Sequence, residues 1–205
     1  ATADVGVVAI AVGDGVVDLF RDAGAQGVVM GGQTMNPSVR DVLEVVDAVA
    51  ASDVIVLPNN KNIVPVAQQL DALTTKRVHV IPTRSVPEGF SAMLAYLPGG
   101  DPQATVAAMV AAMDDVTAGE VTRAARDATT PAGAITEGDW LGIVDGDVRV
   151  VADDCLGASN AVLDEMLGSD SEVLTVVTGV EAGPEITAAM GSRLAEKYPE
   201  LAITF

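Results

Sequence analysis

Four short apolar runs without polar alternation most constrain the fold of the first half of this chain. They are Val5 to Val12, Gly27 to Met30, Asp53 to Leu57 and Val78 to Ile81. A strand with one face in solvent alternates apolar and polar residues, whereas a strand covered on both faces of a parallel sheet does not. Each run is followed by a polar or glycine-rich loop and then by a helix-like segment. The pattern predicts the α/β class, with a doubly wound, mainly parallel sheet and right-handed crossovers.

The segments between the runs have the spacing of amphipathic helices. Val39, Leu43 and Val46 fall on one helical face, and Asn36 or Ser38 is the candidate cap of that helix. Ile63, Ala67 and Leu70 form a second, shorter face. Further helices are predicted to begin near Ser85 and at Asp101-Pro102.

The pattern changes after Val116. Glu120 to Arg126 has strand-like alternation, and Trp140 to Val151 predicts a hairpin that turns at Asp145-Gly146. Helices are expected from about Asp154 to Leu167 and from Gly183-Pro184 onward. We therefore expect two packed parts, a parallel α/β subdomain over 1–117 and a smaller mixed α+β subdomain over 118–205.

Composition excludes several classes of partner. Lys and Arg number 11 against 29 Asp and Glu, which gives a formal net charge of −18. A field of this sign repels phosphate backbones and anionic lipids, so we expect no nucleic-acid partner. No apolar run reaches the roughly 18 residues of a membrane span, and no signal peptide is visible. Cys155 is the only cysteine; together these features predict a cytoplasmic protein.

Polar loops follow the predicted strands at the carboxyl edge of the sheet, where open α/β sheets bind ligands. Their hydroxyl, amide and backbone donors lie beside helix N-termini, which favour anions, and two of their residues are cations. The candidate residues for binding a partner or an anion are Gln33, Thr34, Asn36, Ser38, Asn59, Asn60, Lys61, Asn62, Thr83, Arg84 and Ser85.

A simpler interpretation treats these residues as helix caps and turn formers. Capping explains each of Asn36, Asn60, Thr83 and Ser85 taken singly. It explains less well a loop that reads Asn59-Asn60-Lys61-Asn62. Taken as a set, the loops are better explained by a binding surface.

No complete active site is visible in the sequence. The phosphate-binding Gly-x-x-x-x-Gly-Lys-Ser/Thr motif is absent, and one His and one Cys cannot form a common zinc site. His79 lies inside a predicted strand, where a hydrogen-bonded structural role is expected. We predict no catalytic residue, no metal ligand and no cofactor site within these 205 residues.

Three motifs carry a resemblance to a known family. They are Gly31-Gly32-Gln33-Thr34-Met35-Asn36-Pro37-Ser38, Pro58-Asn59-Asn60-Lys61-Asn62, and Pro82-Thr83-Arg84-Ser85-Val86-Pro87. With them, nearly the whole chain resembles the C-terminal region of the fatty acid kinase A subunit. That family is also described as dihydroxyacetone-kinase-like or as the Dak phosphatase domain, and it is related to DegV.

The resemblance implies a two-domain fold like that of DegV and a role in bacterial lipid metabolism. In such a kinase, an N-terminal domain binds ATP and Mg²⁺, a middle segment forms a homodimer, and the C-terminal region docks a DegV-type fatty-acid-binding protein. The complex phosphorylates the carboxylate of the bound fatty acid. This chain would then be the non-catalytic docking region, with its own kinase domain outside it.

Two other functions remain open. The same loops could form a pocket for a fatty-acid carboxylate or a phosphorylated triose. The related triose-binding protein holds its substrate covalently through a histidine, whereas the single His here lies in a strand. A phosphatase is the least supported alternative, because no nucleophile and base, and no metal cluster, can be identified.

Overall fold

The computed structural model describes residues 5–31 and 36–205. Two compact units divide the chain between Val116 and Thr117, and each is described by itself. Within the described ranges, every helix is too short or too polar to cross a lipid bilayer.

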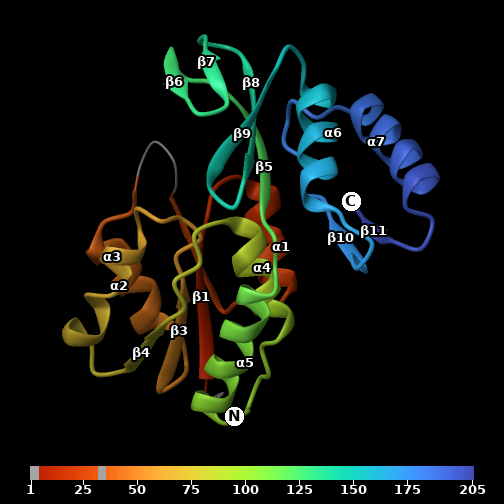
Figure 1. The fold of residues 1–205 in the computed structure, drawn as a ribbon. Coiled ribbons are helices and arrows are strands. Elements are labelled where there is room, and N and C mark those ends of the chain that lie inside the picture. The colour runs from red at the N-terminus through yellow and green to blue at the C-terminus, as the bar shows by residue number, and fades with distance from the viewer. Residues whose placement is uncertain (1–4, 32–35) are drawn as a thin grey trace. The chain divides into compact units, whose positions relative to one another are not determined.

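The first unit contains a sheet of four parallel strands, which are β1 (Val5–Ala11), β2 (Gly27–Met30), β3 (Asp53–Leu57) and β4 (Arg77–Val80). Their order is β2-β1-β3-β4 (Figure 1). All seven residues of β1 are buried, which explains why this run shows no polar alternation. The predicted runs therefore become strands, with Val12 and Ile81 just outside them.

Helices cover both faces of this sheet, namely α1 (Asp14–Asp22), α2 (Val39–Ala48), α3 (Val64–Ala67), α4 (Val86–Leu94) and α5 (Pro102–Asp114). Val5, Val7 and Ala9 of β1 pack in a cluster with α1, α4 and α5. The alternate side chains of Val8 and Ile10 pack in a second cluster with α2 and α3. The structure thus confirms the predicted α/β class with helix layers on both sides.

The crossover from β3 to β4 differs from the expected amphipathic helix. Ile63, Ala67 and Leu70 are all buried on one side, as the spacing predicts. However, the α-helical part is only the four residues of α3, and a 3₁₀ helix, η1 (Leu70–Leu73), follows it. A 3₁₀ turn rises about 2.0 Å per residue, against about 1.5 Å in an α-helix, so the mixed form spans more of the sheet with few residues.

The second unit is a mixed α+β layer. Its elements are β5 (Gly119–Arg123), β6 (Ala128–Thr130), β7 (Gly133–Ile135), β8 (Trp140–Val144), β9 (Asp147–Ala152), α6 (Cys155–Met166), β10 (Val173–Thr175), α7 (Pro184–Lys197) and β11 (Ala202–Thr204). β5, β8 and β9 form an antiparallel sheet, whereas β10 and β11 pair in parallel. Asp145 (φ 50°) and Gly146 (φ 85°) make the β8–β9 turn in the left-handed region, which confirms the predicted hairpin.

Trp140 is the centre of one small core in this unit. It packs with Cys155 and Ala158 of α6, and Arg123 lies over its ring, 4.4 Å from the ring centroid. A second cluster joins α6 and α7 to β10 through Leu163, Leu194 and Leu174. The only tryptophan and the only cysteine of the chain therefore lie in contact in the second unit.

An ionic cluster joins β3 to β4 at the amino end of the parallel sheet. Asp53 is only 2% exposed. Arg77 donates hydrogen bonds to both of its carboxylate oxygens, one of them at 2.7 Å, and His79 Nε2 lies 2.9 Å from Oδ1. The structural role predicted for His79 is confirmed.

This cluster makes stability depend on pH. The Arg77 guanidinium holds the pKa of Asp53 far below its usual value of 3.8, and hydrogen bonds from His79 and Ser52 lower it further, although burial acts the other way. A carboxyl group whose pKa is lowered by folding stabilises the fold above its unfolded-state pKa. That contribution is lost as the pH falls toward the folded-state value.

We expect Asp53→Asn to lower the free energy of unfolding by about 2 kcal/mol at pH 7, because it removes a buried charged acceptor. The difference from wild type should shrink as the pH falls below about 4, where the wild-type carboxylate also becomes protonated. Urea unfolding followed by circular dichroism from pH 7 to pH 2 measures both effects. Asp22→Asn, at an exposed position on α1, is the matched control. A difference that stays constant down to pH 2 would mean that charge is not the cause.

Candidate functional site

The carboxyl edge of the parallel sheet brings the predicted loops together. The register pairs Ala11 of β1 with Met30 of β2, Ala9 with Leu57 of β3, and Val56 with Val80 of β4. Residues 12–15, 36–38, 58–62 and 81–87 therefore leave the sheet at the same edge. Gln33 and Thr34 lie outside the described residues.

Asn59 is the residue that ties this edge together. Its side-chain Nδ2 donates to the carbonyl oxygen of Ile10 at 3.0 Å, and its Oδ1 accepts from the hydroxyl of Thr83 at 2.9 Å. The backbone N–H of Asn59 also donates to the Thr83 hydroxyl oxygen, at 2.9 Å. Asn59 has a φ of 54°, a conformation that asparagine tolerates better than most residues. Its side chain joins the end of β1 to the loops that follow β3 and β4.

This arrangement leaves no room for a side chain at position 89 of α4. A Cβ atom on Gly89 would lie 1.9 Å from Asn59 Oδ1. Thr83 is completely buried and Asn59 is 9% exposed. Of the predicted binding residues, these two therefore act inside the fold and orient the loops around them.

Other predicted residues are helix caps. Ser38 caps α2 by accepting from the backbone N–H of Asp41, whose carboxylate in turn accepts from the N–H of Ser38. Ser85 caps α4 in the same way through Glu88 N–H. Of the two candidate caps for α2, Ser38 is the correct one. For these two serines, the capping interpretation accounts for the hydroxyl.

Asn60 shapes the turn that carries Lys61. Its Oδ1 accepts from the backbone N–H of Asn62 at 2.8 Å, which is an Asx turn. This bond fixes the path of the chain on both sides of Lys61. The turn begins directly after Asn59, so the lysine stands on a short, braced segment.

Exposed donors remain at Asn36, Lys61, Asn62 and Arg84. Arg84 lies 3.5 Å from the Glu88 carboxylate, which partly neutralises it. Lys61 forms no ion pair with any residue that the structure describes. It is therefore the cation at this edge that is available to a partner.

Two apolar side chains at this edge were not predicted to be exposed. Val12 is 55% exposed and Met30 is 62% exposed, although both stand at the ends of runs predicted to be buried. They lie within one residue of each other in the β1–β2 register. The glycines that follow them, Gly13 and Gly31, are the available signal, because a glycine after a strand marks where the covered sheet ends. The edge thus offers apolar surface as well as a cation.

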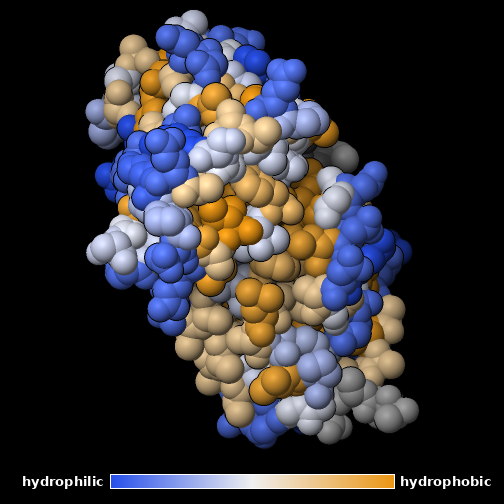
Figure 2. All heavy atoms as spheres, turned by 90° about the vertical axis from the view of Figure 1, so that its right-hand side faces the viewer, coloured by the Kyte–Doolittle hydropathy of each residue, from blue (hydrophilic) through white to orange (hydrophobic). Residues whose placement is uncertain are grey.

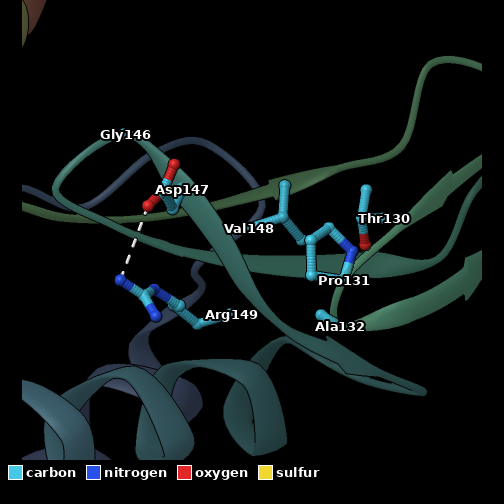
Figure 3. Close-up of a pocket in the computed structure, with 7 residues that line it drawn as sticks. All are labelled: Thr130, Pro131, Ala132, Gly146, Asp147, Val148 and Arg149. Atoms are coloured by element: carbon cyan, nitrogen blue, oxygen red, sulfur yellow. Dashed lines mark hydrogen bonds and ion pairs between the residues drawn. The ribbon is translucent and has the colours of Figure 1, made fainter.

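Cavities occur elsewhere in the described chain. One of about 400 Å³ lies in the second unit between the β6–β7 turn and the β8–β9 hairpin, where Arg149 reaches toward Asp147 across 3.5 Å (Figure 3). Another of about 370 Å³ lies beside Asp53 and Arg77. No residue of the carboxyl-edge loops lines either cavity. Among the described residues, no group of three or more His, Cys, Asp or Glu is placed to hold a metal ion.

Comparison with known proteins gives the family. The family of C-terminal regions like that of the fatty acid kinase A subunit matches residues 6–205. The chain belongs to this family. It is 39% identical to Protein YloV of Bacillus subtilis (strain 168) over 198 residues, which are 97% of this chain and 36% of that protein. It is also 32% identical to an uncharacterized protein of Staphylococcus aureus (strain USA300) over 202 residues, 98% of this chain and 37% of that protein.

The family match confirms the resemblance seen in the loop motifs and extends through both units of the chain. This chain spans little more than a third of the length of these curated relatives. As a C-terminal region of the fatty acid kinase type, it therefore corresponds to one part of those longer proteins.

The contact between Gly89 and Asn59 generates a prediction about this region. Gly89→Ala should lower the free energy of unfolding by about 2 kcal/mol, because the new methyl group collides with a braced side chain. Helix propensity alone would favour alanine by about 1 kcal/mol, so the sign separates the two effects. Urea denaturation measures the change. Gly191→Ala in α7, whose Cβ would meet its nearest neighbour at an ordinary 3.6 Å, should be neutral or stabilising.

A second background isolates the collision. Asn59→Gly keeps the positive φ accessible and removes the side chain. In that background, Gly89→Ala should cost nothing or should stabilise. An equal loss in both backgrounds would place the collision elsewhere.

Proposed function

We propose that this chain is the partner-docking region of a bacterial fatty acid kinase and that the carboxyl edge of its parallel sheet is the docking face. The partner would be a DegV-type fatty-acid-binding protein. The observation that carries the proposal is Lys61. It is an exposed cation with no ion-pair partner among the described residues, on a chain with a net charge of −18.

Preorganisation supports this assignment. Asn59 and Asn60 fix the backbone on either side of the lysine through four hydrogen bonds. A loop that is already ordered loses little conformational entropy on binding, so more of its contact energy appears as affinity. A cation held in this way suits a carboxylate on the partner's surface.

The exposed apolar side chains also favour a protein partner. Val12 and Met30 offer contact area beside the polar loop, and an interface commonly combines an apolar part with a polar rim. A small-molecule site would instead need several free donors that converge on one point. Asn59, Thr83 and Ser85 use theirs within the fold, so these observations favour docking over the alternative of a fatty-acid or triose pocket.

In the proposed reaction, ATP and Mg²⁺ are bound by the protein's own kinase domain, outside this chain. A carboxylate oxygen of the fatty acid attacks the γ-phosphorus of ATP, ADP leaves, and an acyl phosphate forms for lipid synthesis. We propose that this takes place in the cytoplasm and that the full-length protein forms a homodimer. The docking region contributes no reacting group; it holds the lipid carrier where the kinase domain can reach it.

Charge reversal at Lys61 tests the docking face. Lys61→Glu should weaken binding of a fatty-acid-loaded DegV-type protein at least tenfold in calorimetry, mainly through slower association at low salt. Arg21→Glu is the matched control, because Arg21 is exposed and pairs only with Asp18 of the same helix. It changes the net charge equally and should leave the affinity within about twofold of wild type.

Each result of this experiment has a definite meaning. Equal weakening by both variants would show that only net charge matters. Unchanged binding by Lys61→Glu would place the interface elsewhere on the chain. If the wild-type chain binds no DegV-type protein, docking itself is wrong.

A further inference from the structure

The helix α5 lacks a polar outer side. Its exposed positions include Ala104, Ala107, Ala108 and Ala111, and its buried side carries Thr105 and Met109. A helix at the surface of a globular unit normally presents charged or polar residues to water. The four exposed alanines follow the spacing i, i+3, i+4 and i+7, which places them in one strip along the helix.

Large apolar side chains extend this strip. Leu94 at the end of α4 is 72% exposed, and Leu97 in the following turn is 63% exposed. The two helices pack together, and the Ser91 hydroxyl donates to the carbonyl oxygen of Ala112 at 2.7 Å. Single exposed leucines are common on proteins, but a continuous apolar area is not. We call the set the α4–α5 face, defined by Leu94, Leu97, Ala104, Ala107, Ala108 and Ala111.

Figure 2 shows this side of the parallel-sheet unit. A broad apolar area covers the helices on this side of the sheet, and hydrophilic residues border it. The border is strongly biased in charge. The sequence from Ser85 to Val116 contains no lysine or arginine.

The exposed charges along that stretch are all acidic. Asp101 stands at the start of α5, and Asp114 and Asp115 stand at its end. On the neighbouring α1, Arg21 is paired with Asp18 across 3.7 Å. Because neither α5 nor the segment that joins it to α4 carries a basic residue, nothing along this stretch offsets the three aspartates.

We propose that the α4–α5 face docks an amphipathic helix of a partner protein, one whose apolar side is flanked by lysine or arginine. A strip of alanines lets a second helix approach closely, because interaxial distance depends on the side chains at the contact. Leu94 and Leu97 supply apolar area at one end of the strip, and basic flanks complement the aspartates. This proposal is independent of the docking face at the carboxyl edge of the sheet.

Charge also argues against a second copy of this chain as the occupant. Two copies that meet through the α4–α5 face would bring acidic borders together, and each copy already carries a net charge of −18. Like charges across an interface oppose association. A basic partner helix removes this cost.

A helical peptide of about 18 residues, or five turns, tests the proposal. One version carries leucines on one side and lysines beside them, and a matched version has glutamate in place of each lysine. Fluorescence anisotropy at 0.15 M salt, a concentration that screens distant charges beyond about 8 Å, measures binding. We expect the lysine peptide to bind the wild-type chain at least tenfold more tightly than the glutamate peptide.

Substitution in the strip separates docking from simple charge attraction. Ala107→Glu adds a negative charge, so unspecific attraction predicts equal or tighter binding of the lysine peptide. Docking on the α4–α5 face instead predicts binding at least tenfold weaker, because the new side chain blocks the strip. Ala189→Glu on the exposed side of α7 is the matched control and should leave binding unchanged. Circular dichroism verifies that both variants fold.

Three results would overturn the proposal. One is undiminished binding of the lysine peptide to Ala107→Glu, and another is no binding of that peptide to wild type. The third is a wild-type dimer in sedimentation velocity that Ala107→Glu dissociates, since this would identify a second copy as the occupant.

Discussion

A single buried asparagine holds the carboxyl edge of the parallel sheet in place. The side chain of Asn59 bonds to the end of β1 and to Thr83 after β4, while its own backbone continues from β3. Three neighbouring strands therefore end in a fixed relation. That relation determines where Lys61 stands, which residues of the edge face solvent, and why α4 needs a glycine at position 89.

The two interpretations of the polar loops divide the residues between them. Ser38 and Ser85 cap helices, and Asn60 closes a turn, so ordinary local chemistry accounts for their side chains. Lys61 and Asn36 have no such use among the described residues and face outward. A recognition surface can thus be built from caps and turns, because the residues that brace the loops leave the others free to bind.

Much of the fold could be predicted because its signals are local. The unbroken apolar runs indicated the strands of the parallel sheet, and Asp145-Gly146 indicated the hairpin turn. β6 and β7 were not predicted, since these three-residue strands contain one well-buried apolar side chain, Ile135. α3 was predicted too long, because its spacing fits a continuous helix equally well.

The details of the candidate site depend on contacts that no local pattern contains. Asn59 meets Ile10 across 49 positions and Thr83 across 24, so the sequence could not show that its amide is buried while Lys61 is exposed. The outward orientation of Val12 and Met30 likewise depends on where the helix layers end above the sheet. The sequence predicts which residue types gather at this edge, and the tertiary structure decides which of them reach solvent.

The contact of Trp140 with Cys155 has a practical consequence for studying this chain. Both are unique in the sequence, and both lie in the second unit. Indole fluorescence and the rate of thiol labelling therefore report on the opening of that unit alone, without any engineered probe. The parallel-sheet unit is silent in both signals, so the two halves of the molecule can be told apart spectroscopically as they unfold.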